Sequence, residues 1–157
     1  MAVVARSRVI GASARAVWEL VVDPHNLPRW WPDADRVEGV EGEPGARHSR
    51  FTLVMSTSGG RPVRADYRCP EQGAGRRLVW EQQLEDTPFA GFLRSAAIEI
   101  RLDDAAGGTS TVTIEARRRL RGLSRLGSPM MRRATGRTLE RALDGIEGVV
   151  PAGGGRR

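Results

Sequence analysis

Residues 23–32 read DPHNLPRWWP, a stretch that holds two of the chain's four tryptophans between three prolines. Asp23 is suited to cap a helix, and Pro24 fits a first helical position because no backbone hydrogen bond is lost there. Pro28 and Pro32 then limit any helix to a turn or two. The sequence therefore predicts a short, rigid helical corner. Each tryptophan ring buries on the order of 150–250 Å² when it packs, so the corner must pack against a core or a ligand cavity.

On both sides of this corner the sequence changes between helical and strand-like patterns. Residues 3–10 are rich in Val and Ile and predict a strand, and residues 13–22 predict a helix with Ser13 as its cap. Residues 35–119 instead carry apolar side chains at every second position, in runs separated by turn signals. We expect consecutive antiparallel strands with one apolar face at residues 36–41, 46–56, 61–69, 77–85, 91–102 and 109–119.

A long C-terminal helix is predicted for residues 128–149, with Ser128 as cap and Pro129 at the first helical position. Its apolar residues have helical spacing, and about 21 residues at about 1.5 Å each give a length of roughly 31 Å. This length is sufficient to cross the predicted sheet and cover its apolar face. We therefore expect one domain over residues 1–150 and a flexible tail over residues 151–157.

The composition limits the functions that the chain can perform. All 25 basic residues are arginine and the net charge is +6, so lysine chemistry such as Schiff-base formation or a P-loop is excluded. We interpret the charge as a solvated arginine surface, and expect no nucleic acid partner, because stacking aromatics are not interleaved with the arginines. No apolar run approaches the roughly 18 residues of a membrane span. We expect a cytoplasmic monomer or weak homodimer without stable membrane insertion.

The order of one strand, two short helices, an antiparallel meander and a long helix resembles the START-like (SRPBCC) superfamily, especially its polyketide cyclase/dehydrase and lipid-transport group. Residues 10–20 (IGASARAVWEL) resemble the family's junction of first strand and first helix, and residues 23–32 resemble its second helix. The resemblance implies an α+β, helix-grip (START/Bet v 1-like) fold. In this fold a curved antiparallel sheet of roughly six to seven strands wraps around the C-terminal helix. It also implies an apolar ligand cavity between sheet and helix, and no shared catalytic residue.

Three polar side chains fall on the predicted apolar face of three consecutive strands: Tyr67, Gln82 and Arg94. The turn positions place Gln82 opposite Arg94, and they place Trp80 opposite Ala96 and beside Tyr67. Arg94 is suited to pair with a carboxylate, phenolate or enolate oxygen. Tyr67 is suited to donate a hydrogen bond or to act as a weak acid. The alternative for Arg94, near a strand end, is that it reaches solvent or pairs with a nearby carboxylate.

The expected ligand-binding residues lie on the apolar face, the covering helix and the tryptophan corner: Trp31, Phe51, Tyr67, Trp80, Gln82, Arg94, Met131 and Thr135. The candidates for catalysis are Tyr67 and Arg94. One of Trp30 and Trp31 is expected to anchor the core and the other to line the cavity mouth, without a preference between them. We expect no metal site, because a metal needs three or four converging ligands and the two histidines lie in separate loops. We also expect no cofactor.

Three functions fit these residues. The favoured one is binding of a small hydrophobic ligand, of lipid, polyketide or aromatic type, because few catalytic groups fall on the inferred cavity face. The second is a polyketide aromatase/cyclase or a dehydratase-like enzyme that uses the same cavity, since such chemistry needs mainly positioning and enolate stabilisation. The third is an interaction domain whose interior is filled by its own side chains.

Overall fold

One antiparallel sheet forms the frame of the fold in the computed structural model, which describes residues 2–122 and 128–151. Its seven strands have the order β1-β7-β6-β5-β4-β3-β2, so every neighbouring pair except β1 and β7 is consecutive along the chain. The strands are β1 (Ala2–Ile10), β2 (Ala34–Glu41), β3 (Arg50–Met55), β4 (Val63–Arg68), β5 (Arg77–Gln83), β6 (Leu93–Asp104) and β7 (Ser110–Leu120). The sheet that the alternating pattern predicted is confirmed.

Three short helical segments connect β1 to β2, namely α1 (Ala14–Val21), the 3-10 helix η1 (Pro24–Asn26) and α2 (Leu27–Trp30). Ser13 caps α1 by accepting a hydrogen bond from the backbone N–H of Ala16 at 3.1 Å. Asp23 caps η1 by accepting a hydrogen bond from the backbone N–H of His25 at 3.0 Å. Trp31 ends α2 in an extended conformation, immediately before a proline. The helical corner predicted at residues 23–32 is therefore confirmed.

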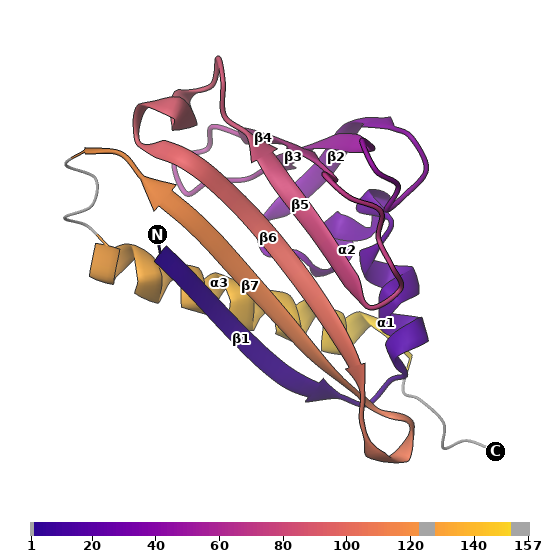
Figure 1. The fold of residues 1–157 in the computed structure, drawn as a ribbon. Helices are drawn as coiled ribbons and strands as arrows, with labels where there is room; N and C mark the ends of the chain where they lie inside the picture. The colour runs from indigo at the N-terminus through magenta and orange to yellow at the C-terminus, as the bar shows by residue number, and fades with distance from the viewer. Residues whose placement is uncertain (1, 123–127, 152–157) are drawn as a thin grey trace.

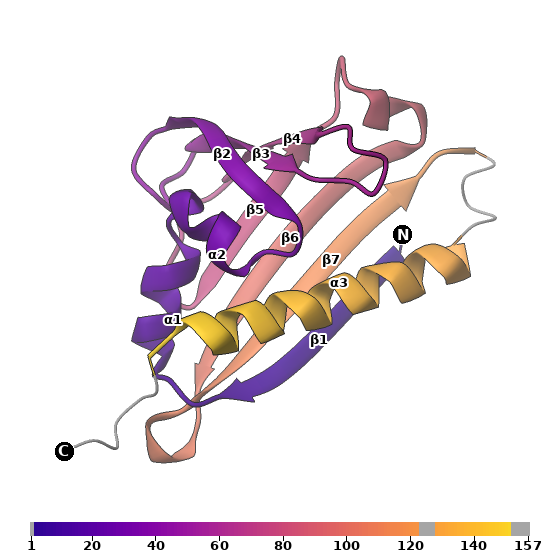
Figure 2. The same cartoon turned by 180° about the vertical axis from the view of Figure 1, so that it is seen from behind.

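The long helix α3 (Ser128–Val149) lies across one face of the curved sheet, and the opposite face is open to solvent (Figures 1 and 2). Apolar side chains of α3 recur at helical spacing and are fully buried against the sheet: Leu139, Ala142, Leu143 and Ile146. Alternate residues of the central strands meet them from the sheet side, including Ile100, Val112 and Ile114. The core therefore lies between the sheet and α3. Of the predicted tail, residues 152–157 lie outside the described residues.

Two strand registers differ from the predicted ones. Trp80 pairs with Ile98 instead of Ala96, and Tyr67 pairs with Gln82 instead of Trp80. In each hairpin the connection is centred one residue later than we predicted, which moves every cross-strand partner by two positions. Because side chains alternate with period two, a shift of two positions leaves each residue on the predicted face of the sheet.

A β-bulge at the start of β6 moves Arg94 to a different face. Leu93 pairs with Leu120 and Ser95 pairs with Arg119, so that Arg94 is the extra residue between the two pairs. Leu93 is buried, with 4% of its surface exposed, whereas Arg94 is exposed. The prediction that Arg94 faces the interior is therefore wrong, because the alternation on which it relied does not continue through a bulge.

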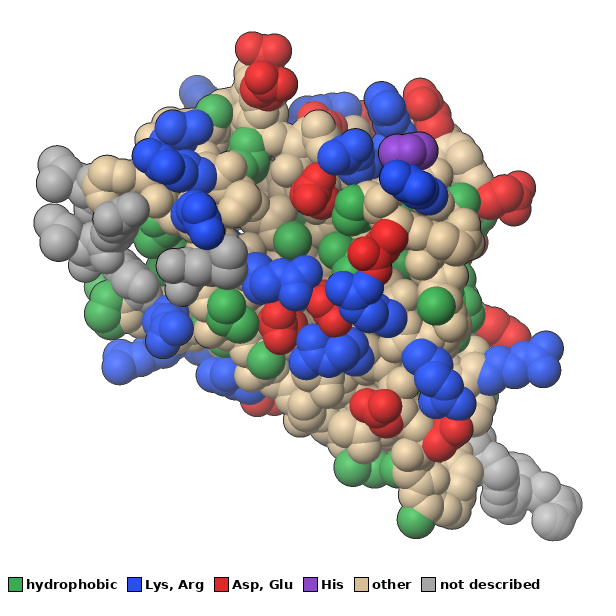
Figure 3. Space-filling model, in the orientation of Figure 1, with side chains coloured by type: hydrophobic (Ala, Val, Ile, Leu, Met, Phe, Trp, Pro, Cys, Tyr) green, Lys and Arg blue, Asp and Glu red, His purple; other side chains and the backbone are tan. Residues whose placement is uncertain are grey.

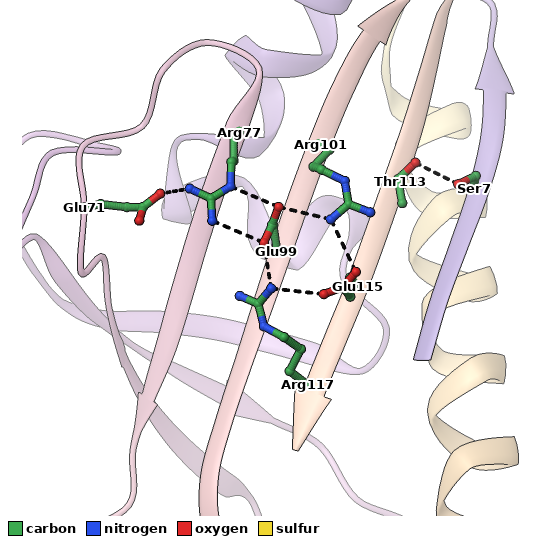
Figure 4. A network of polar contacts seen from close by, with 8 residues as sticks. All are labelled: Ser7, Glu71, Arg77, Glu99, Arg101, Thr113, Glu115 and Arg117. Carbon is green, nitrogen blue, oxygen red and sulfur yellow. Dashed lines mark hydrogen bonds and ion pairs between the residues drawn. The ribbon is translucent and has the colours of Figure 1, made fainter. Parts of the chain in front are cut away.

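The outer face of the sheet carries a network of ionised side chains (Figures 3 and 4). At its centre the carboxylate of Glu99, only 4% exposed, accepts hydrogen bonds from Arg77 at 3.0 Å, Arg101 at 3.0 Å and Arg117 at 2.8 Å. Glu115 on the neighbouring strand accepts hydrogen bonds from Arg101 at 3.3 Å and Arg117 at 3.0 Å. The charge of Glu99 is thus buried with several cationic partners, which offsets its loss of hydration.

This network makes the stability of the protein depend on pH. Burial alone would raise the pKa of Glu99, but hydrogen bonds from Arg77, Arg117 and Arg101 outweigh burial and lower the pKa from 4.5 to about 2. A carboxylate whose pKa is lower in the folded state stabilises the fold above the unfolded-state pKa. That contribution, at most about 3 kcal/mol, is lost as the pH falls through the range between the two pKa values.

We therefore expect the free energy of unfolding of the wild type to decrease from pH 4.5 to about 2 more steeply than that of Glu99→Gln. Urea denaturation at a series of pH values measures both curves. Glu43→Gln, at an exposed loop position, is the control and should give a curve parallel to that of the wild type. Parallel curves for Glu99→Gln and the wild type would contradict the prediction.

Candidate functional site

The inner face of the sheet, which faces α3, carries two separate clusters of apolar side chains. The larger cluster contains most of the core. Five of its aromatic residues lie near one another, and we call these five the aromatic cluster: Trp30, Trp31, Phe51, Tyr67 and Trp80. The smaller one, which we call the mouth cluster, consists of Leu93, Ala96 and Leu120 with Leu84, Phe89 and Met131 packed against them. Because the clusters are separate, the side chains that lie between them decide whether the interior is filled.

Trp80 lies at the centre of the aromatic cluster. Its ring centroid lies 5.6 Å from Phe51, 6.1 Å from Trp30, 6.3 Å from Trp31 and 6.3 Å from Tyr67. Trp30 is 2% exposed, whereas Trp31 remains partly exposed. Trp30 is therefore the residue that anchors the corner in the core, and Trp31 is the one that keeps an accessible surface. The burial of the two rings thus distinguishes the tryptophan that anchors the core, and the role of Trp31 at a cavity stays a prediction.

A row of polar side chains crosses the inner face at the level where the two clusters approach each other. Tyr67 on β4 pairs directly with Gln82 on β5, and Arg118 on β7 pairs directly with Ala96 on β6. Trp80 on β5 pairs with Ile98 on β6. Because the two strands are antiparallel, Gln82, two residues after Trp80, lies opposite Ala96, two residues before Ile98. The row therefore runs from Tyr67 through Gln82 and the small Ala96 to Arg118.

Helix α3 contributes one more polar side chain to this row. The Nη1 atom of Arg118 donates a hydrogen bond to the Oγ1 atom of Thr135 at 3.1 Å, and Thr135 is buried. Met131, one turn earlier on α3, belongs to the mouth cluster. We call Tyr67, Gln82, Arg118 and Thr135 the polar row. It has hydrogen-bond donors from sheet and helix, between two apolar surfaces.

Accessible side chains on the inner face are found along the polar row. Tyr67, Gln82, Arg118 and Met131 keep accessible surface, although their neighbours on the inner face are buried. Within the aromatic cluster, a void lined by Phe51, Cys69 and Trp80 measures only about 10 Å³. A void of that size has room for a single water molecule at most. The side chains of the inner face that solvent reaches therefore include the strand residues of the polar row.

Burial affects the two ionisable residues of the polar row in opposite directions. Burial raises the pKa of the Tyr67 phenol, and the positive charge of Arg118 partly reverses this increase. Burial lowers the pKa of the Arg118 guanidinium, and Tyr67 partly restores it. Arginine stays protonated in proteins, so Arg118 places a fixed positive charge in a poorly hydrated position. Tyr67 remains a neutral hydrogen-bond donor at physiological pH.

Our reading of the sequence did not identify Arg118 as a site residue. It falls within the run Arg117-Arg118-Arg119, part of the arginine surface that we interpreted as solvated. The alternation of Val112, Ile114 and Ala116 was the available signal, because continuing it by one step places the next residue on the apolar face. The inward arginine is thus Arg118 on β7, one strand further than we predicted for Arg94, and Ala96 occupies the position opposite Gln82.

Arg94 lines a groove of about 670 Å³ at the place where β5 and β6 diverge, beyond the pair Glu81–Ala97, and Gln82 and Ala96 line the same groove. The groove contains outward-facing residues such as Arg117 as well as Leu93 of the mouth cluster. It therefore reaches from the outer surface to the edge of the interior. The other predicted binding residues remain together on the inner side: Trp31, Phe51, Tyr67, Trp80, Gln82, Met131 and Thr135.

Comparison with known families gives one match that covers most of the chain. Residues 1–151 match the family model for polyketide cyclase / dehydrase and lipid transport. No curated protein matches the chain. None of the helices in residues 2–122 and 128–151 is long and apolar enough to cross a bilayer.

Several solved structures have the same fold. The Zhui aromatase/cyclase from Streptomyces sp. R1128 has a TM-score of 0.75 at 19% identity, over 98% of this chain and 99% of that one. A START superfamily protein from Mycobacterium smegmatis has a TM-score of 0.76 at 16% identity, over 94% and 96% of the two chains. The di-domain ARO/CYC BexL from the BE-7585A biosynthetic pathway has a TM-score of 0.75 at 19% identity, over 94% of this chain. This chain spans 46% of that protein's length, and at such identities the likeness concerns the fold alone.

Proposed function

The chain belongs to the polyketide cyclase / dehydrase and lipid transport family, and we propose that it binds a small, mostly apolar ligand between the sheet and α3. The observation that carries this proposal is the accessible surface that polar side chains keep along the polar row, between two apolar clusters. Ligand sites are typically apolar cavities with a few well-placed polar groups. Here the aromatic cluster and the mouth cluster supply apolar walls, while Tyr67, Gln82 and Arg118 supply the polar groups.

Within this proposal each part of the site has a distinct role. Trp31 offers an accessible aromatic surface, and Phe51 and Trp80 support it from below. Met131 adjusts to the shape of the ligand at the mouth, because its unbranched side chain is flexible. Arg94, an exposed residue at the bulge of β6, is not one of the polar groups that we assign to the ligand.

Filling the interior at the polar row is expected to prevent ligand binding. Ala96 pairs with Arg118 and is the small residue of the row, so the ring of Ala96→Phe would occupy the ligand's space. We expect wild-type protein to bind the neutral fluorescent probe N-phenylnaphthylamine with one-to-one stoichiometry. We expect Ala96→Phe to bind it at least about tenfold more weakly, because the lost apolar contact area would otherwise stabilise the complex. Fluorescence titration measures both affinities.

The adjacent Ala97 provides a matched control. Its side chain points to the outer face, so Ala97→Phe adds the same ring without entering the interior and should leave the affinity unchanged. Thermal unfolding of both variants shows whether each is folded, and Ala96→Leu is a smaller substitution if the phenylalanine is not tolerated. Unchanged probe affinity in folded Ala96→Phe and Ala96→Leu, or no probe binding by the wild type, would contradict the proposal. The latter result would favour an interaction domain with a filled interior.

A second candidate function is that of a polyketide aromatase/cyclase or dehydratase-like enzyme that uses the same space. The observation that favours it is the placement of a neutral phenol and a fixed cation, Tyr67 and Arg118, on the same row of the inner face. In such a reaction Arg118 would stabilise an enolate oxygen, and Tyr67 would donate a proton. Tyr67→Phe separates the two functions when it is assayed with a poly-β-ketone analogue. Loss of cyclised product with retained probe affinity would establish the enzyme, and no product from the wild type would support binding alone.

A further inference from the structure

Arg118 differs from the arginines beside it in the direction of its side chain and in its partners. Arg117 points to the outer face, where it pairs with Glu99 at 2.8 Å and Glu115 at 3.0 Å. Arg119 is exposed. Arg118 instead points toward α3 and is only partly exposed. This alternation follows from the strand itself, so the inward direction of Arg118 is fixed by β7 and does not depend on a flexible loop.

Arg8, another arginine that faces α3, shows what Arg118 lacks. On the edge strand β1, Arg8 is surrounded by acidic side chains of α3, with ion pairs to Glu140 at 2.9 Å, Asp144 at 2.5 Å and Glu147 at 3.2 Å. Arg118 has no carboxylate within 4.0 Å among the residues that the structure describes. The residues outside this set, Met1, 123–127 and 152–157, include no Asp or Glu. The cation therefore has no acidic side-chain partner from its own chain.

The groups around Arg118 are neutral, and they accept hydrogen bonds from only some of the N–H donors of its guanidinium. Thr135 accepts one hydrogen bond, and Tyr67 and Gln82 are uncharged members of the same row. A guanidinium has five N–H donors in a planar fork that matches the two oxygens of a carboxylate. A poorly hydrated cation without a counter-charge is unfavourable, and an anionic group from a ligand would remove that cost.

The single charge of Arg118 and the apolar side chains beside it indicate which class of anion would bind there. One inward arginine balances a single negative charge, whereas a phosphate monoester carries nearly two. On either side of Arg118 the inner face is apolar, with the aromatic cluster toward β4 and the mouth cluster toward the start of β6. A molecule that fits both features has one anionic end and an apolar body.

We propose that the ligand is an apolar monocarboxylic acid whose carboxylate pairs with the planar fork of Arg118. Its apolar body lies against Trp31 and the aromatic cluster, and Tyr67 donates to the same carboxylate or to a neighbouring oxygen. This assignment rests on the proposed function, because it names the ligand class for the same interior site.

Calorimetric titration with acids and their neutral amides tests this assignment. The probes are decanoate and naphthoate, each compared with its primary amide, decanamide and naphthamide, near neutral pH. We expect wild-type protein to bind the acids more tightly than the amides. We expect Arg118→Gln to weaken acid binding by about tenfold to a hundredfold, since charge-assisted hydrogen bonds are lost, and to change amide binding little. Arg119→Gln removes the same charge from the exposed neighbour and should change neither.

Arg118→Met is a second variant, which separates a loss of binding from a loss of folding. It keeps the length of the side chain while removing a cation without an acidic partner, so it should unfold at a temperature equal to or higher than that of the wild type and still lose acid binding. Equal affinity for acids and amides, or unchanged acid affinity in Arg118→Gln and Arg118→Met, would overturn the assignment while leaving the proposed function intact. An equal loss in Arg119→Gln would indicate surface attraction and also overturn it. Failure of all four probes and of N-phenylnaphthylamine would overturn the proposed function itself.

Discussion

Gly145→Ala is expected to destabilise the protein strongly, although alanine is the better helix former. A Cβ atom at this position of α3 would lie 2.1 Å from the carbonyl oxygen of Trp30 and 2.8 Å from its carbonyl carbon and Cα atoms. All three are backbone atoms of α2, so no side-chain rotation can relieve the overlap. The two helices would have to move apart, and Trp30 would leave its buried position in the aromatic cluster.

We expect Gly145→Ala to lower the free energy of unfolding by about 2–4 kcal/mol, since overpacking typically costs about 1–3 kcal/mol and the obstacle here is rigid. Gly148→Ala is the control on the same helix, because a Cβ atom there meets nothing within 4 Å. That variant should gain up to about 1 kcal/mol from helix propensity. Urea denaturation measures both, and equal stabilisation by the two substitutions would show that α2 and α3 do not approach as closely as described.

Trp80→Ala is expected to have an effect of similar size on the opposite side of the corner. Trp80 is 3% exposed and its ring contacts both tryptophans of the corner. Truncating a buried aromatic side chain typically costs about 3–5 kcal/mol, and we expect a loss in that range. Because Trp80 supports Trp31, the variant should also bind N-phenylnaphthylamine more weakly wherever it remains folded.

Trp80→Phe is the matched control for this prediction. It keeps an aromatic ring between Phe51 and the corner, so we expect a loss of about 1–2 kcal/mol and most of the probe affinity. Denaturation monitored by circular dichroism avoids the change in tryptophan fluorescence. A loss below about 1 kcal/mol in Trp80→Ala would place the ring outside the core and contradict the described cluster.

The elements of the fold were predictable because each has a local signal. Caps and prolines marked the helical segments after β1, and apolar alternation marked every strand from β2 to β7. The face of Tyr67 and Gln82 followed correctly from the same alternation. The cross-strand partners of these residues were predicted wrongly, because the centre of a hairpin loop depends on turn geometry that residue types define only loosely.

The two arginines show where local patterns fail. Nothing in the sequence marks the bulge at Arg94, since a bulge is a property of the pairing between β6 and β7. Arg118 continued the apolar alternation of β7, but its charge and its two arginine neighbours favoured a solvent position. Burial of an arginine opposes the usual rule that charged residues are exposed. Such exceptions concentrate at functional sites, and Arg118 fits that pattern.

The central claim is that the interior between the sheet and α3 binds an apolar ligand, and the four indole N–H groups offer the most direct test. Nuclear magnetic resonance of isotope-labelled tryptophan resolves each indole, and single tryptophan-to-phenylalanine variants assign them. Trp30, Trp31 and Trp80 belong to the aromatic cluster, whereas Trp18 packs at the other end against the loops of Gly45 and Gly73. On titration with N-phenylnaphthylamine we predict shifts for Trp31 and Trp80, and none for Trp18. Unchanged indole signals at saturating probe, or a shift of Trp18 alone, would contradict the claim.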